Sequence, residues 1–176
     1  MDGDNNRPGY SRAYPHTQDP NALYRRSLYT FWKRTVPPPS MAAFDALERE
    51  FCMVQRSRTN TPLQAFVLLH DPQFVEAARK LGERIVLESP EANPAARLTY
   101  GFNLCFARSP NPKELQLLQD AYQTQVAEFN ANPESAKQLL AVGQSSANDQ
   151  IPSVELAAWS SVARILLNLS EFITRP

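Results

Sequence analysis

Apolar residues recur at helical spacing along most of this chain. Tyr24, Leu28, Phe31 and Trp32 fall at i, i+4, i+7 and i+8, which predicts one apolar face on a helix from Pro20 to about Thr35. The same period predicts further helices over 62–70, 72–87, 94–106, 112–129, 133–143 and 153–173. No stretch alternates apolar and polar residues with a period of two, so the pattern predicts an all-α fold.

The expected helix starts share a local signature, a side-chain cap followed by proline. Thr61-Pro62-Leu63-Gln64 is the clearest, because threonine at the N-cap, proline at the first position and glutamine at the third form a capping box. The same cap and proline recur at Asp19-Pro20, Asp71-Pro72, Asn93-Pro94, Asn111-Pro112 and Asn132-Pro133. Together they predict a single bundle of about six to seven helices over 19–176, after a flexible lead-in or linker over 1–18.

Other segments are defined by single residues. The proline run Val36–Pro39 is expected to be extended, after which Ser40 caps a short helix from Met41 to Glu50. Gly143 is expected to end the helix before it in the left-handed conformation, and Ser153 to cap the last helix. The helix from Pro94 is apolar nearly all round and is expected to be central. The last helix is expected to be a principal part of the core.

Charge excludes a strong field around the whole molecule. Lysine and arginine equal aspartate and glutamate, 18 against 18, so we expect no nucleic-acid partner. No apolar run is long enough to cross a bilayer, and the first twenty residues lack the pattern of a signal peptide. The location is therefore unknown if Met1 is a true start, and periplasmic or exported if the chain is a fragment of a longer protein.

Cysteine and histidine are scarce. Cys52 and Cys105 either form one disulfide or stay free, and the sequence leaves both open. The only histidines are His16 and His70, so no metal site is predicted. The chain has no Cys-x-x-Cys-His motif, so we expect no covalent haem and no other cofactor on this chain.

Two polar groups stand out as candidate interaction surfaces. The wet side of the first predicted helix is basic and aromatic, and comprises Arg25, Arg26, Tyr29, Lys33 and Arg34. The second group flanks the start of the helix at Pro62, and comprises Arg56, Arg58, Asn60 and Gln64. Arginines beside a helix start can hold an anion or a carboxylate. The alternative is structural: the first group is a solvated face, and the second pairs with Asp45, Glu48 or Glu50.

An enzymatic interpretation rests on Cys52 and His70. With Arg56 and Arg58 they would line the pocket of a saccharide-related hydrolase or an oxidoreductase. Against this, no histidine is evidently paired with Cys52, and a histidine at a helix end is ordinarily structural. No catalytic residue is therefore assigned.

Several stretches together resemble a known family: RRSLYTFWKRTVPPPSM, RTNTPLQAFVLLHDPQFVEAARKL, RLTYGFNLCFARSPNPKEL, LLAVG and ELAAWSSVARILLNLSEFITRP. They are similar to the carboxy-terminal domain of unknown function of large planctomycete proteins, and the resemblance covers nearly everything after Leu23. Such proteins commonly also carry a cytochrome c-like domain. Two positions depart from the family pattern: Leu47 replaces a proline and His70 replaces an asparagine. The second departure weakens a catalytic role for His70.

The resemblance implies an exported parent protein that binds haem on another domain. Joined to the absence of a catalytic motif, it favours a non-catalytic helical accessory or docking module. Its expected partners are other domains of the parent or a partner protein. The enzyme domain described above is the alternative.

Overall fold

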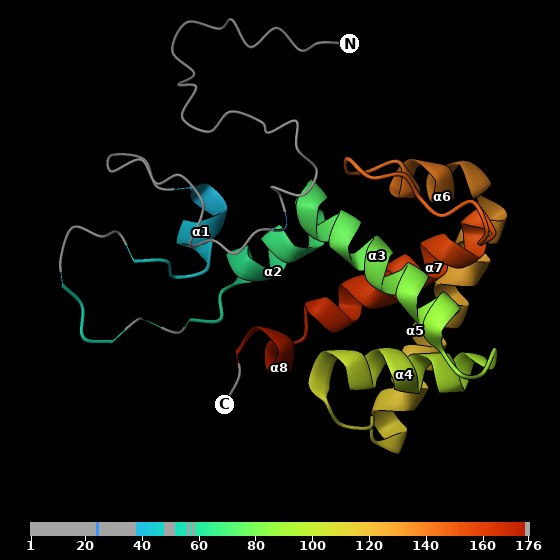
Figure 1. The fold of residues 1–176 in the computed structure, drawn as a ribbon, viewed down its shortest axis with the longest axis horizontal. Coiled ribbons are helices and arrows are strands. Elements are labelled where there is room, and N and C mark those ends of the chain that lie inside the picture. Colours follow the sequence, from blue (N-terminus) through green and yellow to red (C-terminus); the bar gives the residue numbers. More distant parts are fainter. Residues whose placement is uncertain (1–23, 25–37, 48–51, 56, 58, 175–176) are drawn as a thin grey trace, which may run out of the picture. The chain divides into compact units, whose positions relative to one another are not determined.

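The computed structural model describes residues 24, 38–47, 52–55, 57 and 59–174, and divides the chain into two compact units (Figure 1). The first unit, Met1–Thr59, contains α1 (Pro39–Ala43). The second, Asn60–Pro176, contains α2 (Pro62–His70), α3 (Pro72–Glu88), α4 (Pro94–Phe106), α5 (Pro112–Ala131), α6 (Pro133–Leu140), α7 (Ser153–Leu167) and α8 (Ser170–Ile173). Within the described ranges every regular element is a helix, which confirms the all-α prediction.

Some predictions concern residues that the structure does not describe. The expected helix from Pro20 to Thr35 lies outside the described residues apart from Tyr24. The division into a lead-in over 1–18 and one domain over 19–176 stays a prediction.

The predicted helix starts are confirmed from α2 to α6, each of which begins with proline at its first position. At α2 the Thr61 hydroxyl accepts from the Gln64 amide at 3.3 Å, and the Thr61 amide donates to the Gln64 side chain at 3.2 Å. Asn111 and Glu114 form the same reciprocal pair at α5, at 2.9 and 2.7 Å. These caps satisfy donors that the first turn of a helix leaves unpaired.

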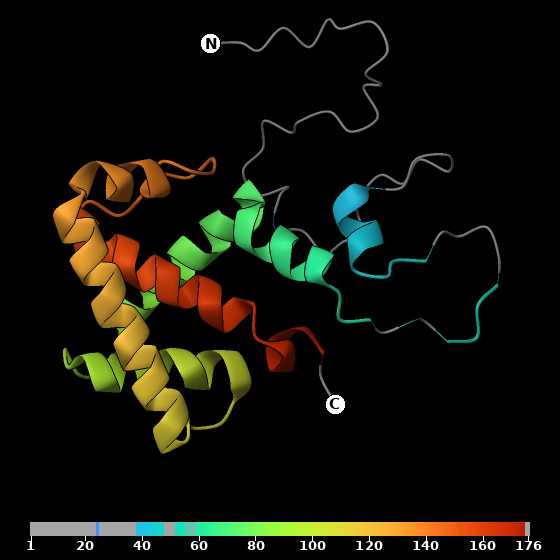
Figure 2. The same cartoon turned by 180° about the vertical axis from the view of Figure 1, so that it is seen from behind.

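Helix α7 is the central element of the second unit. It packs against α3, α5 and α6, and Figures 1 and 2 show it running through the middle of these helices. Trp159, Val162 and Leu166 are fully buried, as the helical stripe predicts. The expectation that the helix from Pro94 is central was wrong, because only Leu98, Gly101 and Phe102 of α4 are buried.

The core of the second unit consists of two neighbouring clusters built on α7. One gathers Ile85, Leu98, Phe102, Leu118, Trp159, Val162 and Leu166. The other gathers Phe129, Ala136, Leu140, Ile151, Leu156, Ala157 and Ala158. Half-buried Tyr122 packs against both clusters, so α5 joins them along the length of α7.

The expected boundaries of three helices were wrong. Helix α1 begins at Pro39, with no side-chain cap, and ends at Ala43; Asp45 beyond it has a left-handed backbone with φ of 57°. Ser153 is the first residue of α7 rather than its cap, and α7 ends at Leu167, so the apolar pattern continues into a separate helix, α8. Gly143 does have a positive φ, 104°, but α6 ends three residues before it.

Buried charges on α3 hold the loop between α6 and α7. Arg79 is 2% exposed, and its guanidinium donates to the main-chain carbonyls of Leu140, Val142 and Ser145. It also donates to the Ser145 hydroxyl at 2.9 Å. A guanidinium carries five N–H donors, so one side chain can satisfy several carbonyls that no helix pairs.

Glu76, one turn before Arg79, binds main-chain amides of the same loop. Its carboxylate accepts from the amides of Gln144 at 2.7 Å and Ser145 at 3.0 Å, and lies 4.0 Å from the Arg79 guanidinium. A Cβ added at Gly143 would lie 2.3 Å from the Glu76 carboxylate, so the close approach requires glycine at this position. We call Glu76, Arg79 and residues 140–145 the α3 clasp.

Candidate functional site

The structure describes only two of the residues predicted to form an interaction surface. Asn60 is exposed and donates to the Ser170 hydroxyl at 3.2 Å, which links the start of α2 to α8. Gln64 is 1% exposed and closes the capping box of α2. The others lie outside the described residues, so their role stays a prediction: Arg25, Arg26, Tyr29, Lys33, Arg34, Arg56 and Arg58.

Of the residues of the enzymatic alternative, the structure describes Cys52 and His70, which belong to different units. Cys52 is an exposed free thiol of the first unit, and His70 ends α2 of the second, with its ring 4.4 Å from that of Phe66. Cys105 is also free, and burial raises the pKa of its thiol to about 11, so it stays protonated at neutral pH. The described ranges contain no group of three histidine, cysteine or acidic residues that could hold a metal ion.

Exposed apolar side chains occur on α2, near the end of α7 and at α8. These are Leu63, Phe66, Ile165, Leu169 and Phe172, which we call the α2–α8 face. Leu63 and Phe66 are 59% and 61% exposed although both are large. The three elements lie at the same end of the second unit in Figures 1 and 2, and α7 packs against both α2 and α8. Gathered exposed apolar side chains are typical of an interaction surface.

Helix α8 is fixed in place by charge and ring contacts. Arg108, just after α4, donates to both oxygens of Glu171 at 2.8 and 2.6 Å and to both oxygens of Glu114 at 3.0 and 2.9 Å. The Phe172 ring lies edge-on to that of Phe106, 6.4 Å between centroids. A helix of four residues has little stability of its own, so these contacts determine how α8 presents its part of the α2–α8 face.

The ion pairs of Arg108 with Glu114 and Glu171 make a testable prediction about the stability of the fold in acid. The Arg108 guanidinium, helped by the Asn111 amide, lowers the pKa of Glu114 from 4.5 to about 2. A carboxyl whose pKa is lower in the folded state stabilises the fold above pH 4.5, and that contribution is lost as pH falls from 4.5 towards 2. We expect Arg108→Met to raise the pKa of Glu114 towards its ordinary value and to flatten the fall in melting temperature over this window.

Carboxyl NMR titration of Glu114 and melts between pH 2 and 6 measure both effects. Lys113→Met is the matched control, because Lys113 is an exposed cation beside Glu114 for which the structure shows no ion pair. A pKa of Glu114 that stays near 2 in Arg108→Met would contradict the assignment.

A second polar cluster lies inside the second unit, around Trp159. Arg97 pairs with Glu155 at 2.7 Å and lies 6.0 Å above the indole ring, and the Tyr122 ring stacks on the indole at 4.4 Å. Burial, and then the Glu155 carboxylate, raise the pKa of Tyr122, so its hydroxyl remains protonated at neutral pH. The four residues join α4, α5 and α7. These contacts pack three helices around one indole ring, so we interpret the cluster as part of the core.

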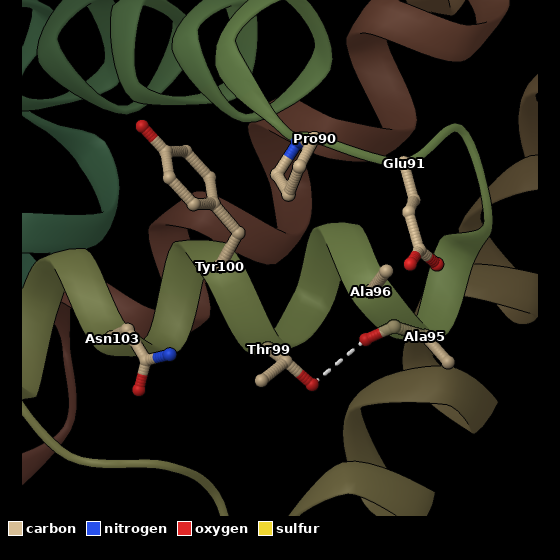
Figure 3. Close-up of a pocket in the computed structure, with 7 residues that line it drawn as sticks. All are labelled: Pro90, Glu91, Ala95, Ala96, Thr99, Tyr100 and Asn103. Atoms are coloured by element: carbon tan, nitrogen blue, oxygen red, sulfur yellow. Dashed lines mark hydrogen bonds between the residues drawn. The ribbon is translucent and has the colours of Figure 1, made fainter.

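A shallow groove of about 370 Å³ lies between the start of α4 and the turn before it. Its lining is Pro90, Glu91, Ala95, Ala96, Thr99, Tyr100 and Asn103, and is largely apolar (Figure 3). The Thr99 hydroxyl donates to the Ala95 carbonyl at 2.9 Å and the Tyr100 hydroxyl to Glu88 at 2.9 Å, so both hydroxyls are engaged. These lining residues offer van der Waals contact and contain no nucleophile beside a base.

Arg164 is the polar residue beside the α2–α8 face that sequence reasoning missed. It lies in the last turn of α7, and its guanidinium donates to the Leu69 carbonyl near the end of α2. Its Nε is buried and has no hydrogen-bond partner. The available signal was one arginine within the apolar second half of this helix, because a charge in such a stripe needs a specific partner.

Comparison with known proteins identifies the family but no characterised relative. A family model described as protein of unknown function (DUF1553), PSD1, matches residues 1–122 of the 176. The chain belongs to the DUF1553 family. No curated protein and no solved structure matches it. Helices α7 and α8 lie beyond the part matched by the DUF1553 model, so the α2–α8 face combines matched and unmatched residues.

None of the helices that the structure describes is long and apolar enough to cross a membrane.

Proposed function

We propose that this chain is a non-catalytic helical docking module of a larger exported, redox-associated protein of planctomycete type, whose haem is bound by another domain. The α2–α8 face carries the proposal, because it places five large apolar side chains on three adjacent elements. The membership of a family of unknown function is consistent with it. The resemblance given by the sequence motifs supports the exported, cytochrome-associated parent.

The partner that fits this face is another domain of the parent with apolar side chains and acidic groups. Apolar side chains would cover Leu63 and Phe66, and an acidic group would meet the cation Arg164 at the end of α7. A nucleic acid does not fit, because the chain has no net charge to attract a polyanion. The basic stretch Arg25 to Arg34, with Arg56 and Arg58, is a second expected contact of the same partner.

The upstream reading frame of the gene is the first test. An in-frame extension that encodes a cytochrome c-like region supports the module. A stop codon immediately before Met1 would contradict it, since the chain would then have no parent.

Hydrogen exchange in the parent tests the face directly. We expect Phe66→Ser with Leu169→Ser to speed amide exchange in α2 and α8 by at least about tenfold, because loss of apolar anchors at an interface costs more than 1 kcal/mol. Leu117→Ser is the control, since Leu117 is 68% exposed on α5 and lies outside the face. The melting temperature of the isolated chain should change little in either variant. Equal exchange in both would contradict docking through this face.

A further inference from the structure

The break between α7 and α8 has no local sequence signal. Asn168 still has helical backbone angles, φ −98° and ψ 0°, and the next residue, Leu169, is extended, with φ −68° and ψ 139°. Neither residue is a glycine or a proline. The starts of α2 to α6 each have a side-chain cap and a proline, whereas the N-cap residue of α8, Leu169, makes no side-chain hydrogen bond. The residues at the break therefore do not themselves require a helix to end there.

Local energetics favour one continuous helix over two. A helix is costly to begin and easy to extend, because its first turn fixes several residues for one hydrogen bond. Residues 168–173 could extend α7 without a second nucleation, whereas α8 must nucleate over four residues. Among the described residues, no main-chain carbonyl accepts from the amides of Ser170 and Glu171. In a continuous helix the carbonyls of Leu166 and Leu167 would accept from these two amides.

Three side-chain contacts hold α8 out of line with α7 (Figures 1 and 2). They fall on three successive residues of α8, and each partner lies elsewhere in the second unit: Asn60 with Ser170 at 3.2 Å, Arg108 with Glu171 at 2.8 and 2.6 Å, and Phe106 with Phe172 at 6.4 Å between ring centroids. Because local energetics favour a continuous helix, we attribute the bend to these contacts.

We propose that Leu169 is a hinge between two states of α8. In the bent state, which the structure shows, α8 is a strap across Phe106 and Arg108 at the end of α4. In the straight state, α7 continues through residue 173 as one helix, and α8 no longer covers these two residues. Arg108 then keeps its ion pair with Glu114 and loses the one with Glu171. The hinge goes beyond the proposed docking function and does not depend on it.

Two triple variants that differ only at position 170 test the hinge by NMR on the complete chain. The released variant is Ser170→Ala with Glu171→Gln and Phe172→Ala, which removes all three contacts and introduces only good helix formers. We expect the Cα chemical shift of Leu169 to move at least about half way from its extended to its helical value near 5 °C. The reason is that propagation constants of about 1 or more make extension of α7 at least as favourable as fraying.

The blocked variant is Ser170→Pro with the same changes at Glu171 and Phe172. Proline fits the bent state, because Ser170 is the first residue of α8 and Leu169 before it is already extended. It does not fit the straight state, where its ring would clash with the carbonyl of Leu166 and the hydrogen bond to that carbonyl would be lost. We therefore expect the Cα shift of Leu169 to stay outside the helical range.

Two controls establish that the variants report on the hinge alone. The Cα shift of Leu166 should stay helical in every variant, which shows that α7 remains intact. Ser170→Pro as a single change should keep the nuclear Overhauser contact between the rings of Phe106 and Phe172, because it is compatible with the bent state.

Three results would overturn the hinge. If Leu169 has the same Cα shift in the released and blocked variants, the residues after α7 merely fray once the contacts are lost. A Leu169 shift unchanged from the wild type in the released variant would show that the bend is a local property of the chain. Loss of the helical shift at Leu166 in the released variant would show that α7 depends on α8 and cannot continue through it.

Discussion

Trp159→Ala is expected to lower the free energy of unfolding by about 3–5 kcal/mol, the range for removing a large aromatic side chain from a core. Trp159 is fully buried, belongs to one core cluster and neighbours the other on α7. Its indole is also the surface on which Tyr122 stacks and over which Arg97 lies. Removing it leaves a cavity that three helices would have to collapse to fill.

Urea denaturation followed by far-ultraviolet circular dichroism measures the effect. Leu117→Ala is the matched control: the residue is also large and helical but exposed, so its change should stay within about 0.5 kcal/mol. Phe102→Ala, in the same cluster as Trp159, should behave like the tryptophan variant. A loss below about 1 kcal/mol at both Trp159 and Phe102 would show that the core is not organised around α7.

Arg79→Met is expected to lower the free energy of unfolding by a comparable amount, about 3–5 kcal/mol, for a different reason. Methionine fills much of the volume but removes a buried guanidinium from its contacts with Glu76 and the loop, and the loss of a buried charged hydrogen-bonding group carries a penalty of this size. The carbonyls of Leu140 and Val142 also lose their donor. Folding stability and hydrogen exchange in the loop should therefore change together.

The control for this prediction is Arg84→Met, on the same helix. Arg84 pairs with Glu88 through side chains that are 55% and 45% exposed, and exposed pairs contribute little, so we expect a change within about 0.5 kcal/mol. If the two arginine variants proved equally stable, the α3 clasp would have no structural role. Unchanged exchange over residues 140–145 in a destabilised Arg79→Met would place the loss elsewhere.

Sequence reasoning succeeded where structure is local. Thr61 and Gln64 lie three residues apart, and their reciprocal capping is encoded in the four residues that form it. It also found the stripe of α7, because Trp159, Val162 and Leu166 keep one helical face whatever they pack against. It failed at the end of that helix, where no glycine or proline marks the break after Leu167 and the apolar spacing continues into α8.

The buried polar groups could not be predicted from the sequence, for a different reason. Glu76 and Arg79 sit three residues apart on α3, the spacing of any solvated ion pair on a helix surface. What buries them is a loop more than sixty residues later, which they contact through main-chain atoms that carry no sequence signal. Arg164 is similar, since its one partner is the carbonyl of Leu69. The predicted residues Arg56 and Arg58 lie outside the described residues and remain untested.

The place of α7 in the chain has a consequence for biosynthesis. Helices α2 to α6 leave the ribosome first, yet the surface that buries Ile85, Leu98 and Phe102 belongs to a helix that begins only at Ser153. A nascent chain that has not yet reached Ser153 therefore has capped helices with their apolar stripes still in water. Folding of the second unit must wait for α7, and until then the exposed apolar stripes are prone to aggregate.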